Sequence, residues 1–213
     1  MITIHHLGVS QSERIVWQCE ELQIPYELKR YQRDPQTRLA PPEYRALHPA
    51  GTSPVISDGD LVLAETGAIM EYINTRYGKG ELVVAPHEAR YADYLFWFHY
   101  ANGSHQPHLM GQMIANIAGY AGDNPVLNTV LGRVDRGLDM MEAQLAKLPY
   151  LAGEKFTSAD IMMFFQLTTM NHFVEQDLST RPNLSGYVQR VSQRPAYRAA
   201  MSKCDPELLS AMP

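Results

Sequence analysis

A short segment in the first third of the chain constrains the fold more than any other part of it. Two apolar runs, 55–56 and 61–63, flank Asp58 and Gly59, and an Asp-Gly pair supplies the positive φ angles that a tight turn needs. Pro54 opens the first run, where a residue without an amide proton is tolerated at a strand start or a sheet edge. The segment predicts a β-hairpin that begins at a proline.

The residues on either side of this hairpin predict a binding site. A cis bond before Pro54 would leave the main chain of Ser53 facing outward, free to pair with an extended peptide. After the hairpin, Glu65 and Thr66 precede an apolar helical pattern, and free amides at a helix N-terminus attract a carboxylate. Glu65 offers a partner for an ammonium. An α-amino acid linked to a short peptide would use all three features, whereas a trans proline and a solvated Glu65 remain the alternative.

The apolar patterns around the hairpin predict an α/β domain over residues 1–77. Its expected order is β-α-β-α-β-β-α, which resembles the thioredoxin fold. The expected elements are strands at 2–6 and 26–29, the hairpin, and helices that begin at Ser10, at Pro42 and at Thr66. Ser10 and Glu13 match a capping box at the start of the first helix.

The rest of the chain predicts an all-helical domain at 88–213, after a linker at 78–87. A long helix from 89 to 119 is expected to bend near Gly103 and Pro107. Further helical patterns lie at 126–148, after a second capping box at Thr157 and Asp160, and at 184–191 and 196–201.

Taken together, the pairs Ser53-Pro54 and Glu65-Thr66 around the hairpin resemble the glutathione-binding half-site of the glutathione transferases. The resemblance extends over nearly the whole chain. It implies an α/β thioredoxin-like N-terminal domain followed by an all-α C-terminal helical bundle. Its implied glutathione-binding residues are Thr52, Ser53, Pro54, Glu65 and Thr66.

The start of the first helix resembles that of the serine-type transferases, with Ser10 followed by Arg14. A free thiol titrates near ~8.5, so glutathione must be ionised to act as a nucleophile at neutral pH. A hydroxyl at a helix N-terminus donates a hydrogen bond to the thiolate and lowers the pKa of the thiol. Ser10 is the first candidate for this donor and Ser12 the second, with pure capping roles as the alternative. Arg14 supports the helix start or pairs with a carboxylate.

The residues that bind the glycine carboxylate of glutathione and the electrophile are less sharply defined. The glycine carboxylate of glutathione needs a cation, and four basic residues are open candidates: Lys29, Arg30, Arg38 and Arg45. Thr52 stands where relatives often carry a longer polar side chain. The resemblance puts the electrophile between the domains, against an adaptable apolar surface. Its candidate residues, which could equally be core, are Trp97, Tyr100, His105, Met110 and Met113.

Composition limits the other functions of this chain of 213 residues. Its formal net charge of −5 and the lack of a basic block argue against nucleic acid as a partner. Two cysteines make no disulfide framework, which fits a reducing, cytoplasmic location. No apolar run suggests a membrane span, and the histidine spacings match no metal-ligand motif, so no metal is expected.

The resemblance implies a homodimeric glutathione transferase that activates the glutathione thiolate for attack on a small electrophile, and the cysteine usage predicts that it is cytoplasmic. Glutathione is then a co-substrate rather than a resident cofactor. The alternatives on the same fold are a glutathione-dependent dehalogenase, isomerase or peroxidase, and a dimeric interaction module without catalysis.

Overall fold

Strand β1 (Ile2–Leu7) is an inner strand of the four-stranded sheet. It pairs in parallel with β2 (Tyr26–Tyr31) and antiparallel with β3 (Val55–Asp58). Strand β4 (Leu61–Ala64) pairs with β3, so that the strand order is β2-β1-β3-β4. The structure is a computed structural model and describes residues 1–209.

Three helices complete this α/β part: α1 (Glu13–Glu21), α2 (Pro42–Arg45) and α3 (Thr66–Arg76). The expected order of elements is therefore confirmed, including the hairpin. Gly59 in its turn has a φ of 62°, which glycine adopts without the steric cost that a side chain would add. The Asp58-Gly59 pair thus forms the tight turn of the hairpin, as the sequence predicts.

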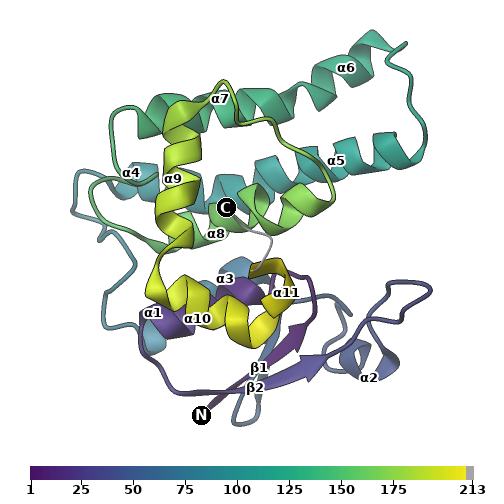
Figure 1. Cartoon of the computed structure of the whole chain (residues 1–213). Coiled ribbons are helices and arrows are strands. Elements are labelled where there is room, and N and C mark those ends of the chain that lie inside the picture. The colour runs from purple at the N-terminus through teal and green to yellow at the C-terminus, as the bar shows by residue number, and fades with distance from the viewer. Residues whose placement is uncertain (210–213) are drawn as a thin grey trace. The chain divides into compact units, whose positions relative to one another are not determined.

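The chain divides into two compact units. The second unit is shorter than the helical domain that the sequence predicts at 88–213. The first unit is Met1–Val83 together with the segment that begins at Ser192, and the second is Val84–Val191. Helices α10 (Pro195–Cys204) and α11 (Pro206–Leu209) thus belong to the α/β unit (Figure 1).

Aromatic packing and ion pairs explain why the C-terminal segment joins the first unit. The rings of Trp17 on α1 and Tyr197 on α10 meet edge to face at 4.7 Å. Arg194, at the N-terminus of α10, donates two hydrogen bonds of 2.7 and 2.8 Å to the carboxylate of Glu21. A bidentate pair of this kind is both stronger and more directional than a single contact.

The second unit contains helices and helical turns (Figure 1). They are α4 (Tyr91–Tyr100), the π-helical turn η1 (Ala101–His105), α5 (Gln106–Ile117), α6 (Pro125–Leu131), α7 (Arg133–Leu145), α8 (Ser158–Leu167), the 3-10 turn η2 (Thr169–His172) and α9 (Pro182–Ser192). None of the described helices is long and apolar enough to cross a membrane.

The long helix expected at 89–119 is interrupted where its sequence indicates. The turn η1 separates α4 from α5, and Pro107 lies in the first turn of α5. Proline cannot donate the helical hydrogen bond of its position, so an irregular turn is expected just before it. The helix expected at 126–148 is likewise divided, at Gly132, into α6 and α7.

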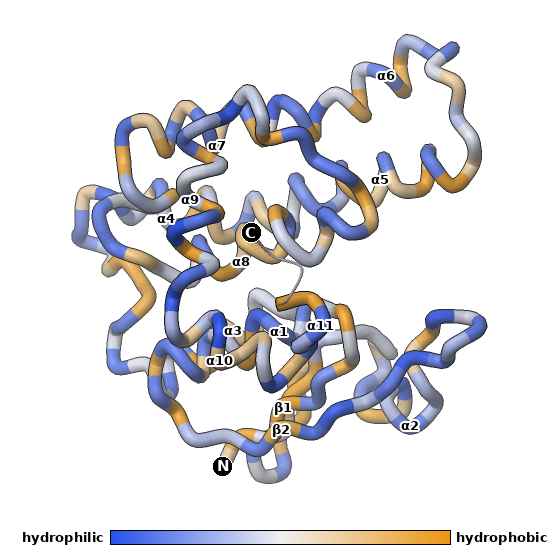
Figure 2. Tube along the Cα trace, in the orientation of Figure 1, coloured by the Kyte–Doolittle hydropathy of each residue, from blue (hydrophilic) through white to orange (hydrophobic). Residues whose placement is uncertain are grey.

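Helix α8 forms the centre of the second unit, and every one of its residues is buried. Its capping box is present as expected. The Thr157 amide donates to Asp160 Oδ2 at 2.9 Å, and the Thr157 hydroxyl to the same oxygen at 3.1 Å. Helices α5 and α6, by contrast, mix hydrophobic and hydrophilic residues along their lengths (Figure 2).

Candidate functional site

The candidate site is built on the loop that joins β1 to α1. Ser10 Oγ donates a hydrogen bond of 2.6 Å to the Leu7 carbonyl. It also lies 2.8 Å from Ser12 Oγ and 2.8 Å from Ser53 Oγ. Ser10 keeps 6% of its surface exposed, whereas Ser12 keeps 0%. Two hydroxyls of the loop and that of Ser53, which is distant in sequence, therefore gather at one point beside the start of α1.

The expected capping box between Ser10 and Glu13 is wrong. Helix α1 begins at Glu13, and the residue at its N-cap is Ser12, whose side chain makes no capping hydrogen bond. The Glu13 amide donates instead to the main-chain oxygen of Ser10, at 3.2 Å. The Ser10 hydroxyl donates to the Leu7 carbonyl and contacts the other two hydroxyls, and its oxygen accepts from the Ser12 amide at 3.4 Å rather than from the Glu13 amide.

The peptide bond between Ser53 and Pro54 is cis. Pro54 is buried at the start of β3, while Thr52 is exposed in the loop before it. Ser53 is partly buried and carries the hydroxyl that meets Ser10. The expected order of a cis-proline, a hairpin and a helix start is therefore present.

The helix start after the hairpin is joined to α1 by side-chain hydrogen bonds. The hydroxyl of the buried Thr66 donates to Gln11 Oε1 at 3.0 Å, and Arg14 Nη1 donates to the same oxygen at 2.9 Å. Glu65 is exposed at the N-cap of α3 and has a φ of 77°, a backbone region that costs a non-glycine residue energy and often marks a functional site. The carboxylate of Glu65 thus stands at a helix N-terminus that is tied to the serine loop.

Arg14 is completely buried in this arrangement. Burial lowers the pKa of its guanidinium to about 9, while the carboxylates of Glu13 and Glu65 act in the opposite direction. Arg14 therefore stays charged at neutral pH, and its cation supports the polar junction between the two helix starts.

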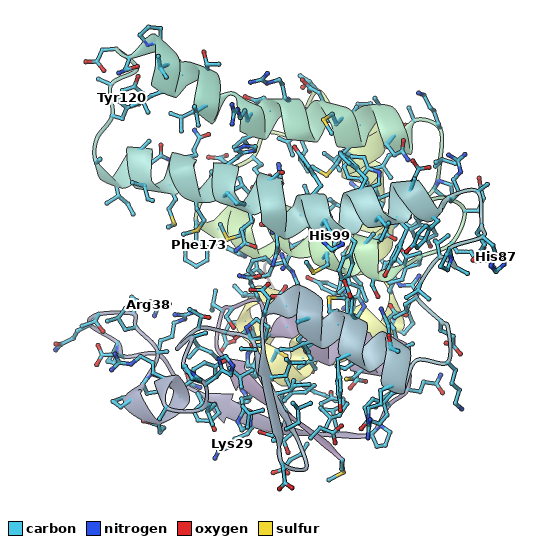
Figure 3. All side chains as sticks on the ribbon, turned by 180° about the vertical axis from the view of Figure 1, so that it is seen from behind. Lys29, Arg38, His87, His99, Tyr120 and Phe173 are labelled. Carbon is cyan, nitrogen blue, oxygen red and sulfur yellow. The ribbon has the colours of Figure 1, made fainter. Side chains whose placement is uncertain are left out.

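The four candidates for the glycine carboxylate are all exposed: Lys29, Arg30, Arg38 and Arg45. Lys29 lies on β2, where its Nζ is 5.3 Å from the centre of the Tyr31 ring, and Arg38 extends from the loop that follows β2 (Figure 3). Arg30 also lies on β2, and Arg45 is the last residue of α2. None of the contacts among the described residues selects one of the four, so the choice stays open.

Three side chains that sequence reasoning did not assign to the site support the serine loop. Arg33 Nε donates to the Gly8 carbonyl at 2.8 Å. The buried His6 lies with Nδ1 2.9 Å from Ser12 Oγ and with Nε2 3.2 Å from Asp205 Oδ2. Asp205 follows α10, far from the loop in sequence. The alternating pattern of a strand does not predict that His6 contacts Ser12. The residues around Asp205 do not predict that Asp205 lies beside β1.

The candidates for the electrophile pocket all lie in the second unit and differ in burial. Trp97 and His105 are buried, Tyr100 and Met113 partly buried, and Met110 exposed. The rings of Trp97 and Tyr100 meet edge to face at 5.9 Å, and Tyr100 stacks on His105 at 6.0 Å. The aromatic members of the set therefore form one cluster around the π-helical turn.

His105 is held in this cluster as a neutral group. Burial is the main reason that its pKa falls to about 4, and the charge of His108 lowers it further. Helix α7 comes close to the cluster at Gly137, where a Cβ would lie 2.5 Å from His105 Nδ1 and 2.9 Å from the Tyr100 hydroxyl. Because Gly137 has no side chain, the α7 backbone can pack directly against His105 and Tyr100.

Comparisons with known proteins agree with this fold. Residues 10–76 match the model of the glutathione S-transferase N-terminal domain, and residues 87–195 match that of the C-terminal domain. The chain is 32% identical to glutathione S-transferase 3 of Schizosaccharomyces pombe, over 99% of this chain and 90% of the relative. It is 27% identical to glutathione S-transferase 1 of Saccharomyces cerevisiae, over 95% of each chain.

Solved structures give the same result. A glutathione S-transferase from Actinobacillus pleuropneumoniae superposes with a TM-score of 0.84 at 32% identity, and the match covers 96% of this chain and 93% of that one. A Phanerochaete chrysosporium glutathione transferase, solved with oxidized glutathione, shares the fold at a TM-score of 0.77 and 21% identity, over 98% and 96% of the two chains. This chain belongs to the glutathione S-transferase family of enzymes.

Proposed function

We propose that this enzyme binds glutathione and that the Ser10 hydroxyl donates a hydrogen bond to its thiolate. The thiolate sulfur then attacks an electrophilic carbon of a small molecule, and the leaving group departs with its bonding electrons or the electron pair moves into the acceptor. The observation that carries this proposal is Ser10 itself, a hydroxyl at the edge of a buried cluster beside the start of α1. The Ser10 oxygen is held in place before the reaction, so that only its proton has to turn toward the sulfur.

Burial and hydrogen bonding favour Ser10 over Ser12 in this role. Ser12 has no exposed surface, and its oxygen is surrounded by the Leu7 amide, the His6 ring and the Ser10 hydroxyl. Ser10 needs only to turn its proton from the Leu7 carbonyl to reach a sulfur at the surface of the cluster. We therefore propose Ser12 as a supporting residue.

The remainder of the tripeptide would be held by the residues around the hairpin. The Glu65 carboxylate is exposed and available for the ammonium group, and the Thr66 amide at the start of α3 suits the neighbouring carboxylate. The main chain at Thr52 and Ser53, before the cis-proline Pro54, would pair with the extended peptide. These contacts would position the sulfur toward Ser10.

The electrophile would be an apolar small molecule bound against residues such as Trp97, Tyr100 and His105, with Met110 and Met113 as adaptable members. A neutral His105 suits an apolar substrate better than a charged one would. We also propose that the enzyme acts as a homodimer in the cytoplasm. Its two described cysteines are both buried and unbridged, which is consistent with a reducing compartment.

The proposal is tested by combining glutathione binding with a conjugation assay. Titration calorimetry measures glutathione affinity, and a chlorinated dinitroarene reports conjugation as chloride is displaced. We expect wild-type protein to bind glutathione and to form the thioether, and Ser10→Ala to keep most of the affinity but lose about 10- to 100-fold in rate. A protein that binds glutathione without conjugating several electrophiles would instead favour the interaction module.

A further inference from the structure

The serine cluster continues inward to a buried ion pair. His6 on β1 is 0% exposed and Asp205 is 4% exposed. His6 contacts Ser12 Oγ through Nδ1 at 2.9 Å and Asp205 Oδ2 through Nε2 at 3.2 Å, and Ser12 Oγ contacts Ser10 Oγ at 2.8 Å. We call these four residues, Asp205, His6, Ser12 and Ser10, the hydroxyl–imidazole chain.

The short contacts around Ser10 give this chain a direction at Ser12. A serine hydroxyl has one proton to donate and two lone pairs to accept with. The Ser10 proton points at the Leu7 carbonyl, 2.6 Å away, because a carbonyl can only accept. Ser10 Oγ also lies 2.8 Å from Ser53 Oγ and accepts from the Ser12 amide at 3.4 Å. Its 2.8 Å contact with Ser12 Oγ needs a proton between the two oxygens, which assigns the Ser12 proton to this contact. Ser12 Oγ accepts from the Leu7 amide at 3.3 Å, and its second lone pair requires a proton on His6 Nδ1.

The other side of the ring faces a carboxylate. His6 Nε2 and Asp205 Oδ2 lie 3.2 Å apart, at ion-pair distance, and neither atom makes a hydrogen bond within the described residues. An unprotonated ring nitrogen would present its lone pair to a buried carboxylate, which is unfavourable where water is excluded. The Val9 amide donates to Asp205 Oδ1 at 3.1 Å, which supports the charged carboxylate. A proton on Nε2, in addition to the one on Nδ1, would give this buried carboxylate its counter-charge.

We propose that His6 is a positioning residue for the thiol chemistry. As an imidazolium paired with Asp205, it turns the Ser12 hydroxyl toward Ser10, so that the Ser10 proton is the outer end of a chain of donors. The inference rests on the proposed role of Ser10. When glutathione binds, the Ser10 proton moves its hydrogen bond from the Leu7 carbonyl to the sulfur, and no proton changes its covalent partner within the chain. Aligned donors polarise one another and strengthen the last hydrogen bond.

Other charged groups approach the ion pair from three elements. Arg30 on β2 lies opposite His6 in the sheet register. The Arg33 guanidinium, in the loop after β2, interacts with the Asp205 carboxylate. Glu13 on α1 acts with Asp205 on the neighbouring Cys204 thiol, whose pKa is raised first by burial and then by these two carboxylates. Two cations, Arg30 and Arg33, and one carboxylate, Glu13, therefore surround the pair, and Asp205 remains the direct counter-charge.

The first test reads the charge of His6 in the protein without glutathione. Nitrogen resonances of the histidine rings, in 15N-labelled wild-type protein at neutral pH, distinguish protonated from unprotonated nitrogens, and the spectrum of His6→Asn assigns those of His6. We expect both His6 nitrogens to be protonated. An unprotonated Nδ1 would overturn the inference, because Ser12 would then donate inward, away from Ser10.

The second test reads the consequence for the thiol. The ultraviolet absorbance of bound thiolate is followed against pH in wild type, His6→Leu, Ser10→Ala and the double variant. We expect His6→Leu to raise the pKa of the bound thiol by about 0.5–1 unit, and to add little in the Ser10→Ala background, where the chain is already interrupted. An unmoved pKa, or an equal shift in both backgrounds, would contradict a role through Ser12 and Ser10.

His6→Asn controls for packing and folding. Its amide nitrogen is as many bonds from Cβ as Nδ1 is, so it can donate to Ser12 without carrying charge. We expect His6→Asn to recover at least half of the shift seen in His6→Leu; no recovery in a folded variant would contradict the donor role. If wild-type protein binds no glutathione, the proposed function fails, whereas the ring resonances still decide the state of His6.

Discussion

The hydroxyl oxygens of Ser10 and Ser53 lie 2.8 Å apart although 43 positions separate them in the sequence. The contact joins the loop that precedes α1 to the residue that precedes the cis-proline. These are the two parts of the α/β unit that would hold the sulfur and the peptide backbone of glutathione.

Glu65→Gln tests the proposed contact with the ammonium of glutathione. The substitution keeps the size of the side chain and the unusual backbone angle of 77° but removes the charge. We expect glutathione affinity to fall by about 10- to 100-fold, as for the loss of a charged hydrogen bond. Titration calorimetry measures this, with Glu71→Gln, an exposed change further along α3, as the control. Equal affinities for wild type and Glu65→Gln would exclude the contact.

Thr157→Ala tests the capping box of α8. The variant loses the hydroxyl that contacts Asp160 at 3.1 Å, and such a cap contributes about 0.5–2 kcal/mol to the free energy of unfolding. Denaturant unfolding should show this loss, while glutathione affinity stays at the wild-type value. Thr157→Ser, which retains a capping hydroxyl, should recover most of the stability; if it is as unstable as Thr157→Ala, the methyl group rather than the cap is responsible.

Gly137→Ala tests the close approach of α7 to the aromatic cluster. The added Cβ would meet His105 Nδ1 at 2.5 Å and the Tyr100 hydroxyl at 2.9 Å. Overpacking of this kind costs about 1–3 kcal/mol, more than the helix propensity of alanine returns. Gly111→Ala on α5 is the matched control, because nothing lies within 4 Å of its new Cβ. We expect thermal unfolding to show a loss for the first variant and a small gain for the second.

His105 should make stability depend on pH. Its pKa falls from 6.5 to about 4 in the folded protein, chiefly through burial. A base whose pKa is lowered by folding stabilises the native state above its unfolded pKa, and this stability is lost as pH falls from about 6.5 toward 4. His105→Phe should flatten the dependence of the unfolding free energy on pH across this window. The exposed His87 (Figure 3) provides the control, and an unchanged slope in His105→Phe would contradict the assignment.

The sequence was informative where structure is set locally. The turn at Gly59, the proline before β3, the interruption before Pro107 and the box at Thr157 each follow from the chemistry of a few adjacent residues. The box at Ser10 failed for the complementary reason. A hydroxyl can bond to whatever lies near it. The Leu7 carbonyl, three residues before Ser10, takes its proton, and Ser53 reaches Ser10 only through the packing of the cis-proline loop.

The contribution of Asp205 to the site could not be found from the sequence. It follows α10, and its place beside His6 depends on the packing of Trp17 against Tyr197 and of Arg194 against Glu21. No local pattern predicts that the last helices return to the α/β unit. The electrophile candidates show the same limit, because aromatic residues at helical spacing are equally suited to a core and to a pocket.

The most direct test of the central claim is the pKa of glutathione bound to wild type and to Ser10→Ala, followed by the ultraviolet absorbance of the thiolate. Ser57→Ala, which removes a hydroxyl that contacts His5 rather than Ser10, is the control. If Ser10 donates to the sulfur, the bound thiol in wild type should titrate well below ~8.5, and Ser10→Ala should raise its pKa by about 1–2 units. A bound thiol whose pKa is the same in wild type and Ser10→Ala, and which shifts in Ser12→Ala, would contradict the account.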